Sequence, residues 1–291
     1  MTQPSHTAFI TGASSGIGAI YAERLAARGY NLILAARRED RLLALADQLQ
    51  ARYAIQASIL KADLSEEHGI AAVEQRLQQD PAIDLFINNA GTAKMAGFLA
   101  STPREHQAIH TLNTTALLRL SYAALAAFIP RRRGTLINIA SILALHTLPG
   151  SAVYSASKAW VLSFTRGLQD EFADSGVRIQ AVLPAATATD LWPTSGVALN
   201  ALPTGTVMTT EDLVDAALRG WRWGNRSPYH RFMTWDCGRL LSSPDWRCLP
   251  AHEPDSLRRG IAKRHLAAGI TPVAEPPSGY KWPRARRRGD R

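Results

Sequence analysis

The chain has 291 residues, of which 46% are hydrophobic and 20% charged, so it can bury a sizeable core and lacks the composition of a disordered protein. It contains no run of about 18 apolar residues, and we expect a cytoplasmic protein without a membrane span. Residues 1–220 contain 18 basic residues (Lys and Arg) and 18 acidic residues (Asp and Glu), whereas the last 71 residues contain 15 basic and 6 acidic ones. The formal charge of +9 therefore belongs to the tail, and no sequence-specific nucleic-acid partner is expected.

Short apolar or β-branched runs alternate with helical patterns as far as Gly220. Six runs are strand candidates: 7–11, 31–35, 55–60, 84–88, 134–140 and 177–183. Between them apolar residues recur at helical spacing, as at Leu42, Leu45 and Leu49. Strands that are apolar on both faces and separated by helices predict an α/β fold, a Rossmann-type doubly wound parallel sheet covered on both sides.

The first strand candidate leads into a glycine-rich turn, TGASSGIG at 11–18. Glycines let the backbone turn sharply and approach a pyrophosphate, which then lies on the free N–H groups of the following helix. The spacing is related to the G-x-G-x-x-G fingerprint without matching it, and a glycine-rich turn with no ligand is the alternative. The cofactor-binding residues predicted here are Gly12, Ser14, Ser15, Gly16, Ile17 and Gly18.

The end of the second strand candidate indicates which nicotinamide cofactor the turn would hold. NAD sites place an acidic residue there, about 20 residues after the turn, to bind the ribose hydroxyls. This chain has Ala36, Arg37 and Arg38 instead. Because guanidinium groups suit a 2′-phosphate, we predict NADP(H) as the cofactor. The alternative is that Arg37 and Arg38 only solvate the start of the next helix.

Taken together, six motifs between Thr7 and about Gly220 resemble the single-domain branch of the short-chain dehydrogenase/reductase family. In chain order they are TGASSGIG at 11–18, Asp63-Leu64, NNAG at 88–91, Asn113, Ser141 and YSASK at 154–158. The resemblance implies an oxidoreductase that transfers hydride between nicotinamide and a carbonyl or alcohol carbon. It further implies a homodimer or homotetramer built on the helices that contain Asn113 and Tyr154.

The resemblance also assigns residues on the adenosine side of the cofactor. Asp63 resembles the residue that binds the adenine amino group, with Leu64 beside it. Asn89, Ala90 and Gly91 resemble the stretch that passes behind the adenosine ribose. For Asn88, tying neighbouring strands together is favoured over ligand contact.

Four residues are predicted to be catalytic: Asn113, Ser141, Tyr154 and Lys158. Tyr154 and Lys158 are four apart at the start of a helical pattern, so both side chains project from one face. An ammonium lowers the pKa of a nearby phenol from about 10, so Tyr154 can donate a proton to a ketone or take one from an alcohol. Ser141 follows the fifth strand candidate, where its hydroxyl can hydrogen-bond the substrate oxygen.

The family resemblance adds two roles to this set. It implies that Asn113 holds a water that links the lysine to solvent, and that Lys158 grips the nicotinamide ribose, so Tyr154 and Lys158 are also counted as cofactor-binding. Each residue has an ordinary structural alternative, because YxxxK occurs by chance and a serine after a strand is common. Their occurrence together with the glycine turn favours the catalytic interpretation.

After the sixth strand candidate the chain departs from the family pattern of proline-glycine, a branched residue and threonine. Pro184 is followed by Ala185, so a methyl group lies where glycine is usual and a reshaped nicotinamide pocket is expected. Pro184, Thr187 and Thr189 are still predicted to contact the cofactor. The next stretch, 190–207, falls where the family has its mobile substrate lid. Its apolar side chains indicate either an apolar substrate contact or lid packing: Leu191, Trp192, Val197 and Leu199.

Beyond Gly220 the alternating pattern stops. Five of the seven tryptophans, eight of the sixteen prolines and both cysteines, Cys237 and Cys248, lie there without zinc-like ligand spacing, so no metal site is expected. We therefore divide the chain into an NADP-binding catalytic domain, 1–220, and an atypical Arg/Trp/Pro-rich extension, 221–291, expected to be poorly ordered. A change of reading frame near residue 220 and a basic appendage for a polyanionic partner both remain open for the extension.

The sequence thus predicts an NADP(H)-dependent oxidoreductase with Tyr154 as its general acid and base. A non-catalytic NADP-binding sensor or regulatory protein on the same fold is the alternative. The four predicted catalytic residues distinguish these two functions, since an oxidoreductase needs them to transfer a proton and a sensor does not.

Overall fold

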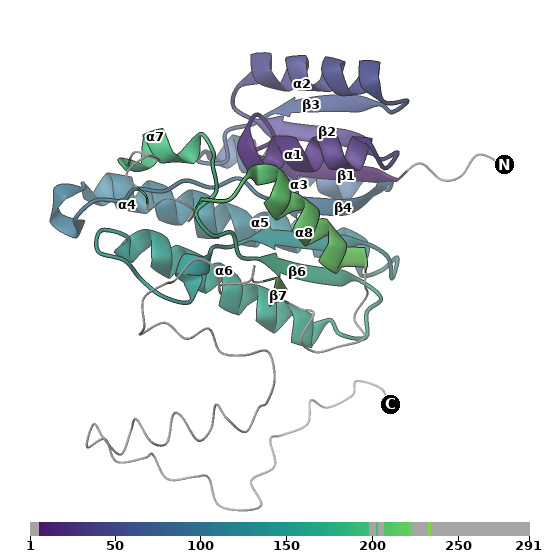
Figure 1. Cartoon of the computed structure of the whole chain (residues 1–291). Coiled ribbons are helices and arrows are strands. Elements are labelled where there is room, and N and C mark those ends of the chain that lie inside the picture. The colour runs from purple at the N-terminus through teal and green to yellow at the C-terminus, as the bar shows by residue number, and fades with distance from the viewer. Residues whose placement is uncertain (1–5, 198–201, 203–206, 223–231, 234–291) are drawn as a thin grey trace, which may run out of the picture. The chain divides into compact units, whose positions relative to one another are not determined.

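The computed structural model describes residues 6–197, 202, 207–222 and 232–233. Within them the chain forms one parallel sheet in the order β3-β2-β1-β4-β5-β6-β7 (Figure 1). The strands are β1 Thr7–Thr11, β2 Asn31–Ala36, β3 Ala57–Lys61, β4 Ile83–Asn88, β5 Thr135–Ile139, β6 Arg178–Val182 and β7 Phe232–Met233.

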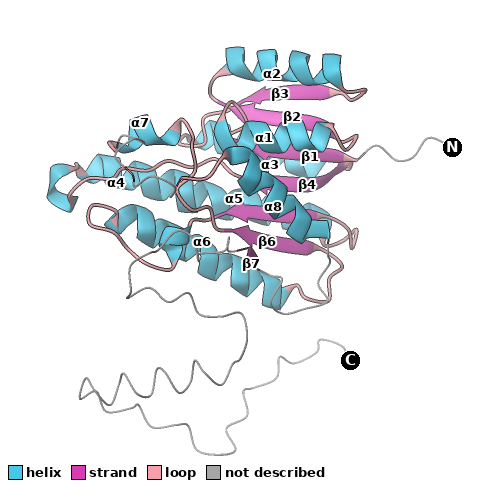
Figure 2. Cartoon of the chain, viewed as in Figure 1, coloured by secondary structure: helices cyan, strands magenta, loops and turns pink. Residues whose placement is uncertain are grey.

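Helices cover both faces of this sheet (Figure 2). The longer ones are α1 Gly16–Ala26, α2 Glu39–Arg52, α3 Glu67–Gln79, α4 Pro103–His110, α5 Leu117–Phe128, α6 Ala152–Glu171 and α8 Thr210–Arg222. The short ones are η1 Phe98–Ala100, η3 Ile142–Ala144 and α7 Leu191–Ser195, and a π-helical turn, η2 Thr111–Ala116, joins α4 to α5. Helices α1, α2 and α8 share one core with the sheet, while α3 and α5 pack on a second core.

The alternation of side chains along the central strands explains the two layers. All five residues of β1 are buried, with Ala8 and Ile10 in the core under α1 and Phe9 in the core under α3 and α5. A strand buried on both faces is mostly apolar, which is why the centres of the segments TAFIT and IDLFIN are apolar runs, Ala8–Ile10 and Leu85–Ile87. At the sheet edge, β3 is only half-buried.

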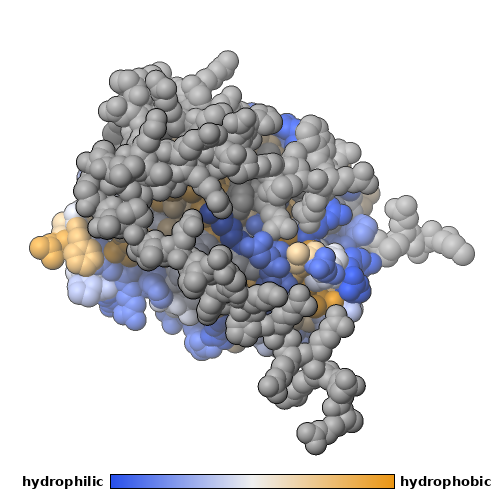
Figure 3. Space-filling view, turned by 90° about the horizontal axis from the view of Figure 1, so that it is seen from below, coloured by the Kyte–Doolittle hydropathy of each residue, from blue (hydrophilic) through white to orange (hydrophobic). Residues whose placement is uncertain are grey.

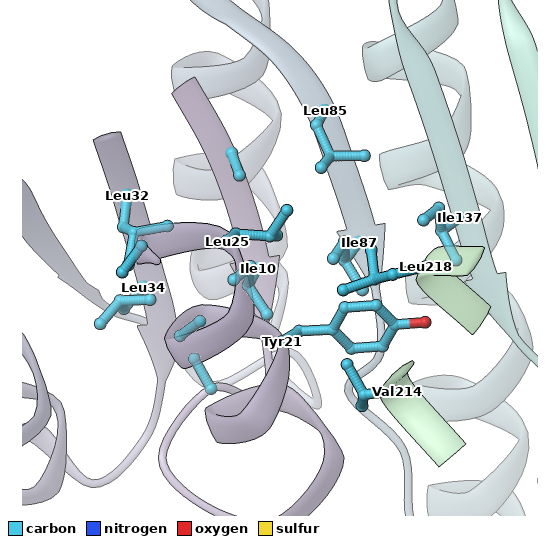
Figure 4. Close-up of a cluster of buried hydrophobic side chains, with 14 of the residues drawn as sticks. Ile10, Tyr21, Leu25, Leu32, Leu34, Leu85, Ile87, Ile137, Val214 and Leu218 are labelled. Atoms are coloured by element: carbon cyan, nitrogen blue, oxygen red, sulfur yellow. The ribbon is translucent and has the colours of Figure 1, made fainter. Parts of the chain in front are cut away.

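One polar group lies deep in the first core. The ring of Tyr21, on α1, is fully buried and lies near Ile87, Val214 and Leu218 (Figure 4). Its hydroxyl has no hydrogen-bond partner among the described residues. Burial without a partner raises the pKa of this phenol, so it stays protonated.

The strand order creates a switch point between β1 and β4. From β1 the chain runs outward to β2 and β3, then crosses back to β4 on the other side of β1 and continues to β5 and β6. In open α/β sheets, ligands bind beyond the carboxyl ends of the strands at such a point. The glycine turn after β1 and the NNAG segment at the end of β4 therefore meet there.

All six predicted strands are present, with ends shifted by two residues or fewer. Beyond Gly220, where the sequence showed no alternating pattern, Phe232 and Met233 pair with Ala181 and Val182 of β6 as a short seventh strand. Two residues carry too little pattern to be recognised in a sequence. Helix α8 also continues to Arg222, two residues past the predicted boundary. The rest of the predicted extension lies outside the described residues. No helix in the part of the chain described is long and apolar enough to cross a bilayer.

Candidate functional site

The glycine turn after β1 has the backbone that its sequence predicts. Gly12 and Gly16 have φ values of +66° and +54°, which favour glycine. A side chain at Gly18 would collide with the carbonyl oxygen of Gly12 and lie 2.8 Å from Nδ2 of Asn89. Ser15 is the N-cap of α1 but its side chain makes no capping hydrogen bond. Close packing of the turn therefore requires the glycines and leaves the helix N-terminus without a side-chain cap.

The end of β4 holds this turn in place. The Asn89 amide donates to the carbonyls of Thr11 (2.9 Å) and Gly12 (3.3 Å). The backbone N–H groups of Asn89 and Ala90 both donate to the Thr11 hydroxyl, at 3.0 and 3.1 Å. Asn89 is thus a support of the glycine turn, and its side chain is engaged with protein backbone. The Asn88 side chain has a structural role, but it ties β4 to helix α5 where a link between neighbouring strands was expected, since its amide donates to the Leu117 carbonyl and the Ser121 hydroxyl.

The two adjacent arginines after β2 lie in different surroundings. The Arg38 guanidinium donates to the hydroxyls of Ser14 and Ser15, at distances down to 3.0 and 2.7 Å, so it lies against the glycine turn. Arg37 is 70% exposed, and its Nη1 lies 4.0 Å from a carboxylate oxygen of Asp63. The structure therefore brings only Arg38 to the turn that both were predicted to serve.

The Asp63-Leu64 pair is mostly engaged in local structure. One carboxylate oxygen of Asp63 accepts from the Ser65 N–H and hydroxyl at 2.9 and 2.8 Å, which stabilises the turn after β3. The Leu64 side chain is buried in the core beneath α3. Ile17 likewise packs against the core on the α1 side. Leu64 and Ile17 can therefore contribute to a ligand site mainly through their backbones.

Asn113 lies in the π-helical turn between α4 and α5 and is 1% exposed. Its Oδ1 accepts from the Thr92 N–H and its Nδ2 donates to the Thr92 carbonyl, both at 2.9 Å. Nδ2 also donates to the Ser157 hydroxyl (3.0 Å), which in turn donates to the Tyr154 carbonyl (2.7 Å). Asn113 therefore joins the segment after β4 to the helix that carries the predicted acid.

The remaining three predicted catalytic residues meet at the ends of β5 and α6. Ser141 caps the short helix η3, and Tyr154 and Lys158 occupy the first two turns of α6. The Ser141 hydroxyl lies close enough to the Tyr154 phenol to lower its pKa, and Nζ of Lys158 donates to the carbonyl of Ile139 at 2.9 Å. A Cβ placed on Gly91 would lie 3.5 Å from that Nζ and 3.2 Å from Oδ1 of Asn113. Asn113 and Lys158 thus lie beside Gly91, and Lys158 joins them to Ser141 and Tyr154 at the carboxyl end of β5.

Burial dominates the electrostatics of this group. Desolvation raises the pKa of Tyr154 above 10.0, and the nearby Ser141 hydroxyl opposes that shift. Desolvation also lowers the pKa of Lys158 from 10.5 to about 8. The pKa of Tyr154 is therefore raised, and not lowered as was expected from Lys158, because both side chains are removed from water. Tyr154 holds its proton at neutral pH, as a proton donor must.

The segment after β6 folds over the glycine turn. A Cβ on Gly16 would lie 3.2 Å from Cγ2 of Thr189. Thr187 is buried, its hydroxyl donates to the carbonyl of Ala185, and its carbonyl accepts from the Trp192 indole at 2.7 Å. Trp192 therefore packs on this segment. Leu199 lies outside the described residues.

Ala185 does not strain the chain where the family has glycine. Among the described residues only Arg132, of those that are not glycine, has a positive φ. Alanine therefore fits the backbone at position 185. The neighbouring Pro184 is buried, and its carbonyl accepts from the N–H of Ile142 at 2.8 Å, which joins this segment to the start of η3.

Three residues that the sequence analysis did not single out belong to this arrangement. Ser157 links Asn113 to Tyr154, and Asp190 accepts hydrogen bonds from Arg38 and Arg41. A signal for Arg41 was present, because residues three apart at the start of a helix share a face. The position of Asp190 depends on a contact across about 150 residues of sequence, which no local pattern reveals.

Comparison with known proteins points to one family. Residues 6–198 match the profile described as short chain dehydrogenase. Sulfoacetaldehyde reductase from Chromohalobacter salexigens is 36% identical over 71% of this chain and 84% of its own length. The human protein named inactive hydroxysteroid dehydrogenase-like protein 1 is 31% identical over 63% of this chain. The chain spans only 56% of that relative's length, and about three fifths of the length of several other curated relatives.

Two solved structures resemble the whole arrangement. A short-chain dehydrogenase from Sphingobium yanoikuyae in complex with NADPH is 38% identical, with a TM-score of 0.75, and the match covers 94% of this chain and 100% of that one. A bulky-bulky ketone specific alcohol dehydrogenase from Comamonas testosteroni is 34% identical, with a TM-score of 0.71 and coverage of 96% and 99%.

Proposed function

The chain belongs to the short-chain dehydrogenase/reductase family, and we propose that it is an NADP(H)-dependent oxidoreductase acting on a carbonyl or alcohol carbon. The observation that carries this proposal is the convergence of Ser141, Tyr154 and Lys158 at the carboxyl end of β5. A proton donor, a hydrogen-bonding hydroxyl and a buried amine at this strand end form a site for carbonyl chemistry.

The residues around the glycine turn fit a dinucleotide. The turn has two glycines with positive φ, and the N-terminus of α1 has no side-chain cap, so its N–H groups can receive a phosphate. The proposed contact residues are Gly12 to Gly18 of the turn, Asp63 and Leu64, Asn89 to Gly91, and Pro184, Thr187 and Thr189. The nicotinamide cofactor, when bound, supplies or accepts the hydride.

We assign the proton to the Tyr154 hydroxyl. During reduction Tyr154 donates this proton to the carbonyl oxygen, while the Ser141 hydroxyl hydrogen-bonds the same oxygen as its negative charge develops. The Lys158 ammonium stabilises the phenolate that remains. Asn113 holds the helix of Tyr154 in position through Ser157, in addition to the water-holding role implied by the resemblance.

Arg38 is the residue we propose for the 2′-phosphate of NADP(H). It lies against Ser14 and Ser15 at the carboxyl end of β2, and a guanidinium can bind phosphate through two parallel hydrogen bonds. Arg41 adds a second positive charge at the same place. Arg37, which points toward Asp63, has the smaller role.

The loops around the site favour an apolar substrate. Backbone hydrogen bonds join the loop after β4 to α7 and to the start of α6, from Met95 N to Ser195 O (2.7 Å) and from Ala96 N to Gly150 O (3.0 Å). These loops expose large apolar side chains: Phe98, Leu99, Leu145 and Leu148. Figure 3 shows apolar side chains at the left edge of the molecule, where the loop before α4 lies.

Lys94 is the only basic residue of the loop 91–102, and it is paired with Glu105 at 3.1 Å. A bulky apolar ketone therefore suits these loops better than a small anionic aldehyde. The resemblance to the alcohol dehydrogenase from Comamonas testosteroni supports the same choice.

A second copy of the chain is the partner we propose for the outer face of α4, α5 and α6. A groove of about 440 Å³ there is lined by His110 and Thr114 on one side and by Val153, Ala156 and Trp160 on the other. Leu118 and Tyr122 on α5 are also exposed, at 42% and 72%. Exposed apolar side chains on adjacent helices are typical of an interface. A homodimer or homotetramer in solution is expected, and light scattering tests it.

The sensor alternative is supported only by resemblance to a relative named inactive. Turnover decides between the two functions. Oxidation of NADPH, and of NADH in its place, is measured with bulky aryl ketones and with a small anionic aldehyde. Arg38→Gln is compared with a control, Arg28→Gln, whose guanidinium donates to the Arg24 carbonyl.

We expect the turnover of bulky ketones to be at least about tenfold faster with NADPH than with NADH. Arg38→Gln is expected to reduce this preference for NADPH, and Arg28→Gln is expected to leave it unchanged. Binding of NADPH without turnover of any carbonyl would favour the sensor. Faster turnover with NADH would overturn the cofactor assignment.

A further inference from the structure

Asp190, just before α7, lies against the two arginines at the end of β2. Its Oδ2 accepts from Nη1 of Arg41 at 2.8 Å and from Nη1 of Arg38 at 3.3 Å. The Ser15 hydroxyl also helps to lower the pKa of this carboxyl group. The hydrogen bond from Arg41 is the main reason that the pKa of Asp190 lies below its ordinary value, so the group is ionised at neutral pH.

The partners of Asp190 form the kind of site that binds a phosphate. Two guanidinium groups and the hydroxyls of Ser14 and Ser15 surround one point beside the glycine turn. A carboxylate and a phosphate monoester are both anions with oxygens that accept from a guanidinium fork. The Asp190 carboxylate thus occupies the position at which the 2′-phosphate of the proposed cofactor would bind.

Two anions compete for such a site. If the phosphate bound while the carboxylate stayed, two negative groups would share the same guanidinium nitrogens, and their repulsion would oppose binding. The Asp190 side chain is 57% exposed, so it is free to rotate into solvent when a stronger anion arrives. The phosphate brings more charge and more acceptor oxygens than the carboxylate does.

We propose that Asp190 is an internal competitor for the 2′-phosphate, and that it sets how strongly the chain prefers phosphorylated over unphosphorylated nucleotides. This inference rests on the proposed NADP(H) function. The competition costs affinity only for nucleotides that carry a 2′-phosphate. Asp190 is therefore a specificity-determining residue that weakens the preference Arg38 and Arg41 create.

The test is direct binding, by calorimetry on the full chain, of adenosine 2′,5′-bisphosphate and of 5′-AMP, neither of which contains nicotinamide. Both are titrated into the wild type, Asp190→Asn and Asp190→Ser. The matched control is Asp215→Asn, which removes the carboxylate of another partly exposed Arg–Asp pair, with Arg24 at 2.9 Å. Thermal melts confirm that each variant is folded.

Asp190→Asn and Asp190→Ser are expected to bind the bisphosphate about 2 to 5 times more tightly than the wild type, as suits a partly exposed ion pair. Their affinity for 5′-AMP stays the same, and the gain shrinks at high salt because the competition is electrostatic. Asp215→Asn changes neither affinity. Unchanged or weaker binding of the bisphosphate to both Asp190 variants overturns the inference, as does an equal gain for 5′-AMP.

The failure of the inference is distinguishable from failure of the proposed function. If the wild type binds the bisphosphate more tightly than 5′-AMP and Arg41→Gln reduces this difference, the two arginines form a 2′-phosphate site as proposed. The binding of the bisphosphate to the Asp190 variants then tests the competition by itself. If the wild type and the Asp190 variants all bind the two nucleotides equally, both the NADP(H) assignment and the competition are wrong.

Discussion

The Nζ atom of Lys158 lies 5.9 Å from the centre of the Tyr154 ring. Both side chains are almost fully buried, and burial acts on them in opposite directions. It raises the pKa of the phenol and lowers that of the amine to about 8. The phenol therefore keeps its proton at neutral pH, whereas the amine begins to lose its charge at mildly alkaline pH.

The rate of ketone reduction is expected to follow the charge of Lys158. Tyr154 remains protonated across the neutral range, so kcat/KM with NADPH is constant below about pH 7. Above about 8, loss of the ammonium removes the charge that stabilises the phenolate, and kcat/KM falls by up to about tenfold per pH unit. A pH profile, with NADPH affinity measured at each point, checks this. A rate that rises through pH 8 would contradict it.

Replacing the buried ammonium should stabilise the protein while it abolishes activity. We expect Lys158→Met to raise the free energy of unfolding by about 1 to 3 kcal/mol at pH 7, because burying the charge is costly. The lysine in the unfolded chain titrates near 10.5 and in the folded chain near 8. Between these values the unfolded chain binds the extra proton, so wild-type stability rises with pH relative to the variant.

Denaturant unfolding of the wild type and Lys158→Met at about pH 7 and pH 10 measures this difference. The advantage of the variant should narrow at the higher pH. A variant that is less stable than the wild type at pH 7 would show that the hydrogen bond to Ile139 outweighs the cost of burial.

Two glycines on helices offer a matched pair of substitutions. Alanine at Gly18 would collide with the Gly12 carbonyl, so Gly18→Ala is expected to lose about 2 kcal/mol or more of stability, together with nucleotide binding. At Gly167, within α6, an added Cβ meets nothing within 4 Å. Gly167→Ala should therefore gain about 0.5 to 1 kcal/mol through helix propensity. Thermal melts and NADPH titration of both variants test the pair. Equal changes of stability and of NADPH affinity in the two variants would contradict the claim that close packing of the turn requires glycine at position 18.

The sheet could be predicted because its signal is local. Short, mostly apolar runs such as TAFIT identify the central strands, and the order of the motifs identifies the family. The two-residue strand β7 could not be predicted, since Phe232 and Met233 show no alternation. The boundary at residue 220 and the cytoplasmic location remain predictions.

Within the site, residue identity was easier to predict than residue surroundings. The motifs select Arg37 and Arg38 equally, but only the fold shows that Arg38 lies on the glycine turn and Arg37 beside Asp63. The direction of the Tyr154 pKa shift was also hidden, because it depends on burial of both side chains. The sequence indicates which groups approach one another, while desolvation follows from the packing around them.

Tyr21 provides a test of the core that is independent of the site. Its hydroxyl is buried without a partner in the described part of the chain, and an unpaired buried polar group is costly. Tyr21→Phe should leave stability unchanged or raise it by up to about 1 kcal/mol. A loss of more than about 1 kcal/mol in denaturant unfolding would reveal a hydrogen bond to this hydroxyl.

The role of Tyr154 is tested most directly by comparing turnover and cofactor binding in Tyr154→Phe. Because only the hydroxyl is removed, the account predicts that kcat for ketone reduction falls by about 100-fold or more while the Kd for NADPH stays within about twofold of the wild type. Tyr53→Phe, at a partly buried tyrosine at the end of α2, is the control and should retain full activity. Turnover by Tyr154→Phe within about twofold of the wild type would contradict the proposed proton transfer.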